Sequence, residues 1–312
     1  MIARLADTDL EVFPLCLGGN VFGWTLDEER SFAVLDAFVA GGGNFIDTAD
    51  LYGRHGAGGV GGSERIIGRW IAARGNRERL VVATKVGMSQ ELPGLSRETI
   101  RRGVAGSLER LGIERIDLYY AHRDDPETPL QETLEAFAEL IGEGRVSHVA
   151  ASNYSAPRLA EALRLGAERE DCARYVALQP QYNLMERDYE RELEPLCRRE
   201  GLACLPYFGL ARGFLTGKYR PGGAEIDSPR AAGVREAYFN PRGFAVLDAL
   251  DEVAGAHGVG PAAVALAWLR QQPTVLAPIA SATSPEQLAE LMASATLALT
   301  PEQVERLSAA GA

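Results

Sequence analysis

Four titratable side chains of four different types lie at the ends of three neighbouring strand-like stretches of the sequence. Asp47 and Tyr52 follow the first stretch. Lys85 lies at the end of the second, and His122 directly follows the third. Taken singly, each could be an ordinary polar residue at a strand end, so it is their joint occurrence that predicts chemistry.

The chemistry that these types could perform together is proton transfer to a carbonyl oxygen. Lys85 and Asp47, if buried side by side, would form a desolvated ion pair, and the ammonium would lower the pKa of the Tyr52 phenol. His122 could hydrogen-bond to the oxygen that the phenol protonates. Such a donor is suited to protonating a carbonyl oxygen while hydride reaches its carbon.

These residues need a scaffold of alternating strands and helices, and the sequence predicts one. Most of the expected strands are continuous apolar runs, as in parallel strands that are buried on both faces. They are residues 13–17, 44–48, 80–86, 116–121, 146–151, 175–179, 202–207 and 275–279. Amphipathic stretches separate them, for example the face formed by Ile100, Val104 and Leu108. Eight strands in alternation predict a single-domain (β/α)8 TIM barrel over residues 1–312, with catalytic groups at the carboxyl ends of its strands.

Two segments depart from the alternation. Residues 1–12 precede the first strand and are expected to form a short hairpin over the barrel floor. Residues 216–240 are polar, contain Gly and Pro, and predict a long loop after the seventh strand, where long loops tend to be functional. Two late helices are expected to begin at Ser284-Pro285 and Thr300-Pro301, each with an N-cap hydroxyl and a capping-box Gln.

The sequence Gly-Ala-Gly-Gly-Val-Gly at 56–61 matches the letters of the dinucleotide fingerprint. That fingerprint binds pyrophosphate only where a strand turns directly into a helix. Here the preceding strand is expected to end near Thr48, and several residues intervene. We interpret the motif as a flexible loop at the barrel mouth that leads into a helix from Ser63.

Composition limits the remaining function classes. The 312 residues carry a formal net charge of −11, which argues against nucleic acid and anionic lipid as partners. No apolar run approaches the roughly 20 residues that span a bilayer, and the N-terminus lacks a signal-peptide core, so we expect a cytoplasmic protein without a membrane association. Four scattered Cys and four scattered His predict no metal site.

Three stretches resemble the signatures of the aldo-keto reductase superfamily. They are Phe-Ile-Asp-Thr-Ala-Asp-Leu-Tyr-Gly at 45–53, Ala-Thr-Lys-Val-Gly at 83–87 and Asp-Leu-Tyr-Tyr-Ala-His-Arg at 117–123. The resemblance runs from about residue 15 to residue 291 and implies an NAD(P)(H)-dependent oxidoreductase without a Rossmann domain. It implies that Tyr52 is the general acid/base, that Lys85 and Asp47 tune it, and that His122 orients the carbonyl of an aldehyde, ketone or sugar.

The resemblance also implies a set of residues that hold the cofactor. Ser152, Asn153 and Gln179 correspond to the residues that bind the nicotinamide carboxamide, and Tyr207 to the aromatic ring on which the nicotinamide stacks. The loop 210–219 corresponds to the one that wraps the pyrophosphate, with Leu210, Gly213 and Lys218 in it, and Arg212 and Arg220 could add charge. Phe208-Gly209 replaces the usual Ser-Pro before this loop.

The segment after the eighth strand departs most from the family. Ser281 and Thr283 offer hydroxyls there, but residues 279–284 contain no cation for the 2′-phosphate of NADPH. Gln287 and Glu290 fall where relatives bind adenine, although Gln287 would also serve as the capping-box residue. The resemblance therefore implies NADPH, with NADH possible.

Other functions stay open on the sequence alone. Some relatives of this barrel are nicotinamide-binding regulatory subunits of potassium channels, which turn over little substrate. An aldolase that uses Lys85 as a Schiff-base nucleophile is disfavoured, because Asp47 would keep the ammonium charged. Trp24 is the expected aromatic wall of the substrate pocket, or else a packing residue under the hairpin. The partner is a small carbonyl or alcohol substrate, and the sequence does not predict which one or the oligomeric state.

Overall fold

A computed structural model describes residues 2–312 and contains the barrel that the alternation predicts. Its strands are β3 (Cys16–Gly18), β4 (Phe45–Asp47), β5 (Val81–Val86), β6 (Ile116–Ala121), β7 (Val146–Ser152), β8 (Tyr175–Gln179), β9 (Ala203–Cys204) and β10 (Ile279–Ala280). All neighbours pair in parallel, in the order β10-β3-β4-β5-β6-β7-β8-β9. Backbone hydrogen bonds from Leu276 to Cys204 and from Ile279 to Pro206 close the ring between β9 and β10.

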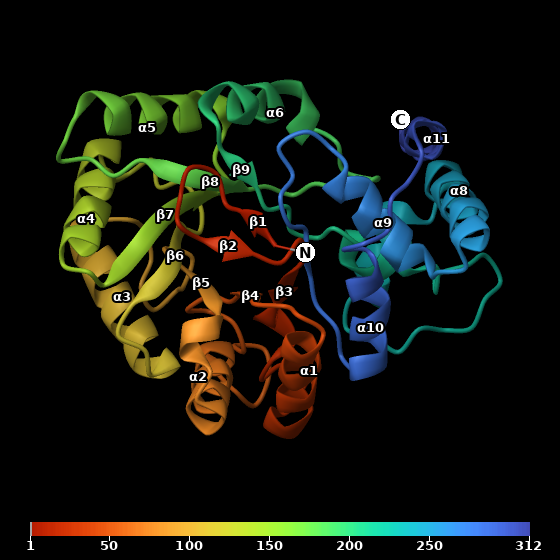
Figure 1. Cartoon of the computed structure of the whole chain (residues 1–312), viewed down its shortest axis with the longest axis horizontal. Coiled ribbons are helices and arrows are strands. Elements are labelled where there is room, and N and C mark those ends of the chain that lie inside the picture. Colours follow the sequence, from red (N-terminus) through yellow and green to blue (C-terminus); the bar gives the residue numbers. More distant parts are fainter. Residues whose placement is uncertain (1) are drawn as a thin grey trace.

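Helices alternate with the strands and surround them (Figure 1). The helices are α1 (Glu28–Ala40), α2 (Gly62–Arg74), α3 (Arg97–Leu111), α4 (Leu130–Gly142), α5 (Ala156–Glu168), α6 (Tyr189–Glu200), α7 (Ala231–Tyr238), α8 (Pro241–His257), α9 (Pro261–Arg270), α10 (Pro285–Ala293) and α11 (Pro301–Ala310). Three short 3₁₀ helices are η1 (Gly19–Val21), η2 (Arg77–Arg79) and η3 (Ala211–Thr216). Gly112 and Gly201 end α3 and α6 with φ of 63° and 69°, the left-handed caps for which the sequence supplies glycine.

The hydrophobic core has two layers. The larger lies between the barrel and its helices, and a smaller cluster fills the barrel interior. The interior cluster includes Phe45, Leu118 and Tyr120, together with Leu5 and Val12 from the N-terminal segment. That segment is the predicted hairpin, with β1 (Ala3–Arg4) antiparallel to β2 (Glu11–Val12). The hairpin therefore closes the barrel floor with apolar side chains, and the opposite end stays open for a site.

The structure corrects two expectations about local elements. The segment 216–240 is not wholly a loop, because α7 occupies its second half and buries Val234 and Tyr238. The predicted capping box is complete at α11, where the side chains of Thr300 and Gln303 cap each other's backbone. At α10 only Ser284 caps, because the side chain of Gln287 bonds elsewhere.

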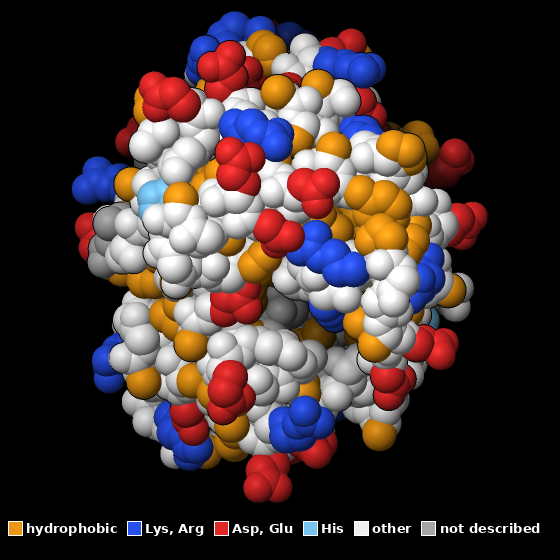
Figure 2. Space-filling model, turned by 90° about the vertical axis from the view of Figure 1, so that its right-hand side faces the viewer, with side chains coloured by type: hydrophobic (Ala, Val, Ile, Leu, Met, Phe, Trp, Pro, Cys, Tyr) orange, Lys and Arg blue, Asp and Glu red, His pale blue; other side chains and the backbone are white. Residues whose placement is uncertain are grey.

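The molecular surface carries both signs of charge. On the face formed by the C-terminal helices, acidic and basic side chains alternate with small apolar areas around a hollow (Figure 2). Over residues 2–312, no helix is both long enough and apolar enough to cross a membrane.

Candidate active site

The carboxyl ends of β4, β5 and β6 bring the four titratable residues together. Asp47 ends β4 and pairs in register with Ala83 of β5, and Lys85 pairs with Tyr120 of β6. His122 follows β6 directly, and its backbone N–H bonds to the carbonyl of Val86. Because the three strands are parallel neighbours, side chains far apart in sequence meet at one end of the barrel.

Lys85 is the centre of this group. Its side chain is fully buried, and its Nζ donates to Asp47 Oδ2 at 2.5 Å and to the carbonyl oxygen of Thr48 at 2.7 Å. The same Nζ lies 3.4 Å from the hydroxyl of Tyr52. Gln179 donates to the second oxygen of Asp47 at 3.0 Å. The ion pair is thus buried with its hydrogen-bonding groups satisfied, as a buried charge requires.

The pKa values follow from burial and from this pair. Burial alone would lower the pKa of Lys85, but Asp47 and then Tyr52 outweigh it and raise that pKa. Burial raises the pKa of Tyr52, and the attraction of Lys85 only partly offsets it. The expectation that the ammonium would lower the phenol's pKa below its ordinary value is therefore wrong for this structure. Removal from water outweighs the neighbouring cation, so Tyr52 holds its proton at neutral pH.

His122 faces Tyr52 across the site. Their ring centroids are 6.0 Å apart, with the planes nearly perpendicular. Burial lowers the pKa of His122 well below its usual range, and the cations Lys85, Arg123 and Arg54 lower it further. The imidazole is therefore neutral at physiological pH and can offer an N–H as well as a lone pair.

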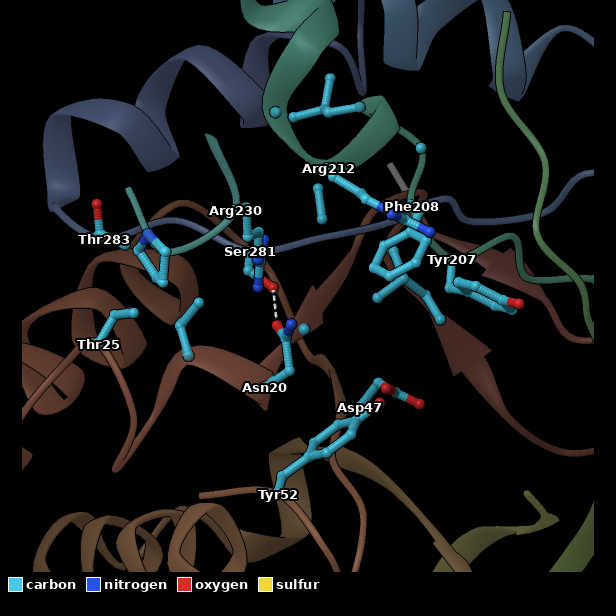
Figure 3. Close-up of a pocket in the computed structure, with 18 of the residues that line it drawn as sticks. Asn20, Thr25, Asp47, Tyr52, Tyr207, Phe208, Arg212, Arg230, Ser281 and Thr283 are labelled. Carbon is cyan, nitrogen blue, oxygen red and sulfur yellow. Dashed lines mark hydrogen bonds between the residues drawn. The ribbon is translucent and has the colours of Figure 1, made fainter. Parts of the chain in front are cut away.

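A cavity of about 930 Å³ opens above these residues and extends well beyond them (Figure 3). Asp47 and Tyr52 lie at one end, Tyr207 and Arg212 along one side, and Thr283 at the far end. Fourteen sequence-predicted residues line it: Asp47, Tyr52, His122, Ser152, Asn153, Gln179, Tyr207, Leu210, Arg212, Gly213, Lys218, Ser281, Thr283 and Gln287. Lys85 lies behind them, bonded to Asp47 and Tyr52.

A network of side-chain amides and hydroxyls lies beside Asp47, Tyr52, Lys85 and His122, which together we call the tetrad. The Nδ2 of Asn153 donates to the carbonyl oxygen of His122 at 2.9 Å, and its Oδ1 accepts from the hydroxyl of Tyr207 at 2.8 Å. Ser152 donates to the backbone oxygen of Gln179 at 2.9 Å. These contacts fix the predicted carboxamide-binding residues and the predicted stacking ring relative to one another before any ligand arrives.

The loop after β9 has an unusual backbone. Phe208, Ala211 and Arg212 all have positive φ, at 54°, 46° and 58°, and Asn153 has 56°. These four are among six such non-glycine residues in the part of the chain that the structure describes, and all four lie at or next to the cavity. Strained backbone of this kind clusters at functional sites. Gly213, with φ of 98°, continues the bend and lies close to Lys218.

Hydroxyl and amide groups line the far end of the cavity. Ser281 donates to Asn20 Oδ1 at 2.5 Å, as drawn in Figure 3. The Oε1 of Gln287 accepts from both the backbone N–H and the hydroxyl of Thr283, at 3.0 Å and 2.8 Å. The side chain of Gln287 therefore bonds to Thr283, just before α10 begins, and does not form a capping box. Its amide nitrogen is available to a ligand.

Besides Lys85, three predicted residues lie outside this cavity. Trp24 contacts His55, with ring centroids 6.1 Å apart, and the guanidinium of Arg230 lies 5.0 Å above its ring. Arg220 forms an ion pair with Asp251 and does not line the cavity. The carboxylate of Glu290 lies against Gly260, at the start of α9. Trp24 lies after η1, at the same end of the barrel as Tyr52, and contacts His55 and Arg230 rather than the hairpin.

Several residues of the cavity wall were not among those predicted from the sequence. Asn20 follows β3, so the strand-end rule could have identified it. Arg30 on α1 and Arg230 before α7 carried no sequence signal, because neither belongs to a strand-end motif. Arg230 is half-buried, and burial together with the neighbouring Arg212 lowers the pKa of its guanidinium.

The glycine-rich segment at 56–61 has a packing role in this structure. A Cβ at Gly56 would lie 2.4 Å from the backbone oxygen of Gly23 and 2.6 Å from the Cα of Trp24. The segment therefore packs backbone to backbone against the connection that follows η1. It does not form a strand-to-helix turn, since β4 ends at Asp47 and α2 begins at Gly62.

The cavity residues fit an extended nicotinamide dinucleotide. Amides and an aromatic ring lie beside Tyr52, the cations Arg212 and Lys218 line the cavity as well, and hydroxyls line its far end. The strained backbone of the β9 loop supplies a close-approach surface between these ends. A polar, anionic and elongated ligand matches this order of groups, whereas a compact apolar one does not.

Comparison with known proteins identifies the family to which this chain belongs. The family model described as "Aldo/keto reductase family" matches residues 14–312. Norsolorinic acid reductase stcV of Emericella nidulans is 33% identical, over 95% of this chain and 77% of its own. The uncharacterized oxidoreductase YrpG of Bacillus subtilis is 34% identical over 97% and 94%, and the probable voltage-gated potassium channel subunit beta of Oryza sativa subsp. japonica 35% over 98% and 95%. The protein therefore belongs to the aldo/keto reductase family of NAD(P)H-dependent oxidoreductases.

Proposed function

We propose that the protein reduces the carbonyl of an aldehyde, ketone or sugar to the alcohol, with Tyr52 as the proton donor and NADPH as the cofactor. The observation that carries the proposal is the position of Lys85, buried between Asp47 at 2.5 Å and the Tyr52 hydroxyl at 3.4 Å. The expected cytoplasmic location and single-domain organisation stay predictions.

The bound nicotinamide would supply the hydride. This chain's residues supply the proton and its control. Tyr52 holds a proton at neutral pH because burial raises its pKa, so it enters the reaction as an acid. As the proton leaves the hydroxyl, the ammonium of Lys85 stabilises the phenolate, and Asp47 keeps that ammonium charged.

His122 would position the carbonyl oxygen. Its neutral imidazole can donate an N–H to the same oxygen that Tyr52 protonates. A charged imidazolium would itself compete as an acid, so the lowered pKa of His122 supports Tyr52 as the proton donor. Ser152, Asn153 and Gln179 would hold the nicotinamide carboxamide, and Tyr207 its ring.

Replacing Tyr52 by Phe tests the mechanism, because it removes the hydroxyl and keeps the ring. We expect kcat for aldehyde reduction to fall by about 10²- to 10⁴-fold, with the affinity for NADPH nearly unchanged. Steady-state kinetics and fluorescence titration measure the two quantities. Tyr119→Phe is the matched control, since that buried hydroxyl has no hydrogen-bond partner among the described residues. A Tyr52→Phe protein with full turnover would overturn the role of Tyr52.

A regulatory nicotinamide-binding subunit is the second candidate, and the 35% identity with a probable potassium channel subunit beta favours it. The complete tetrad argues for turnover. A carbonyl panel distinguishes the two functions: tight NADPH binding without reduction of any aldehyde or ketone would favour the regulatory subunit.

A further inference from the structure

We propose that Arg30, on α1, supplies the positive charge that binds the 2′-phosphate of NADPH. The inference deepens the proposed function and rests on it. Residues 279–284, where the family places a cation, contain none. Arg30 lines the same end of the cavity from a different element.

The closure of the barrel explains how a helix near the N-terminus reaches this end. β3 and β10 are hydrogen-bonded neighbours although they are far apart in sequence. The helices that follow them, α1 and α10, therefore lie side by side and in contact (Figure 1). This arrangement places the first turn of α1 next to the loop between β10 and α10.

The guanidinium of Arg30 is directed toward that loop. Its Nη2 lies 3.5 Å from the carbonyl oxygen of Thr283. Two of the neighbouring acids have other partners, since Asp27 accepts from the backbone N–H of Arg30 and Glu28 pairs with Arg69. Among residues 2–312, no carboxylate forms an ion pair with Arg30, so its charge is available to a ligand.

The groups around Arg30 match a phosphate better than a ribose hydroxyl. Gln287 Oε1 is occupied by Thr283, which leaves the amide nitrogen of Gln287 as a donor. An acidic residue is the usual partner of a free 2′-hydroxyl, whereas arginine is the usual partner of a 2′-phosphate. The carboxylates that line the cavity are Asp47, paired with Lys85, and Asp227, on the segment before α7. Neither belongs to the β10–α10 loop or to α1.

The test compares nucleotides that differ only in this phosphate. Tryptophan-fluorescence titration and calorimetry give the affinity of the wild type and of Arg30→Ala for NADPH, NADH, 2′,5′-ADP and 5′-AMP. One charge-assisted contact corresponds to a loss of roughly tenfold or more. We expect that loss for NADPH and 2′,5′-ADP, and less than about twofold for NADH and 5′-AMP.

Two further variants complete the design. Arg30→Lys keeps the charge and should restore part of the NADPH affinity. Arg102→Ala removes an exposed arginine on α3, outside the cavity, and should leave all four affinities unchanged. Unchanged NADH affinity also reports that Arg30→Ala is folded.

The outcomes separate this inference from the proposed function. Equal weakening of NADPH and NADH in Arg30→Ala, or no weakening of either, would overturn the role of Arg30 while leaving the reductase proposal intact. A wild type that binds neither dinucleotide would overturn the proposed function itself. A wild type that binds NADH far more tightly than NADPH would also contradict the assignment of Arg30.

Discussion

The buried pair of Lys85 and Asp47 links the stability of the fold to the proton transfer proposed for Tyr52. Lys85→Met keeps the side-chain volume but leaves Asp47 buried without its cation. We expect a loss of about 3–5 kcal/mol in the free energy of unfolding. Adding Asp47→Asn removes the stranded charge and should recover part of that loss, without recovering turnover. Urea unfolding and kcat measure the two effects, and a double variant that still reduces aldehydes would show that the cation is dispensable.

At the scale of single residues, side-chain type and strand-end position predicted that Asp47, Tyr52, Lys85 and His122 would meet, whereas the family resemblance implied the other cavity residues that were named from the sequence. Type and position were not sufficient for the pKa of Tyr52. A cation beside a phenol lowers its pKa and burial raises it, and the sequence does not give the balance of the two. Arg30 was missed for a related reason, because its place in the cavity depends on which helices meet at the barrel seam.

At the scale of elements, the packing of α2 and α3 against β4–β6 encloses a buried acidic group that the sequence did not signal. Neither carboxylate oxygen of Asp50 has a hydrogen-bond partner, whereas Glu64 accepts from Thr84 and Arg110. Burial, with the nearby charge of Glu64, raises the pKa of Asp50 to about 7. The folded state therefore holds a proton on Asp50 over a pH range in which the unfolded chain has released it.

This linkage gives a signed prediction for Asp50→Asn. The unfolded carboxyl ionises near pH 4 and the folded one near pH 7, so wild-type stability falls as pH rises between these values. A difference of about three pKa units corresponds to roughly 4 kcal/mol. Relative to the wild type, Asp50→Asn should gain stability from pH 4 to pH 7 and level off above it. Urea unfolding at several pH values measures the gain, and exposed Asp188→Asn is the control. A difference that does not change with pH would refute the buried titration.

Among the elements, long buried strands were predicted accurately, whereas short strands and α7 were not. Long apolar runs placed β6 and β8 to the residue, because both strands are nearly completely buried. The expected strands 13–17 and 202–207 correspond to the shorter strands β3 and β9. The remaining residues of both predicted ranges have irregular backbone and belong to loops. α7 was missed inside a polar segment because its stability comes from burying Val234 and Tyr238 against distant residues.

At the scale of the whole molecule, the negative net charge conceals a local cluster of positively charged side chains. The chain carries −11 overall, yet five cations line one cavity: Arg30, Arg123, Arg212, Lys218 and Arg230. Within residues 2–312, none of the five forms an ion pair with a carboxylate. A cleft that concentrates one sign of charge attracts an anionic ligand against the overall repulsion. Composition argued against nucleic acid as a partner, but only the folded arrangement gathers these cations around one ligand-sized space.

The continuity of the barrel interior predicts one cooperative unfolding unit. Leu5 and Val12 of the hairpin, Tyr120 of β6 and Ile279 of β10 belong to one buried cluster, so no part of the ring can unfold without exposing the rest. Urea unfolding followed by tryptophan fluorescence, with Trp70 on α2 and Trp268 on α9 both buried, should coincide with unfolding followed by far-UV circular dichroism. NADPH at about 100 times its dissociation constant should stabilise the protein by about 2.7 kcal/mol and shift both curves equally. Two separated transitions, or a shift by NADPH of only one of them, would contradict a single-domain barrel.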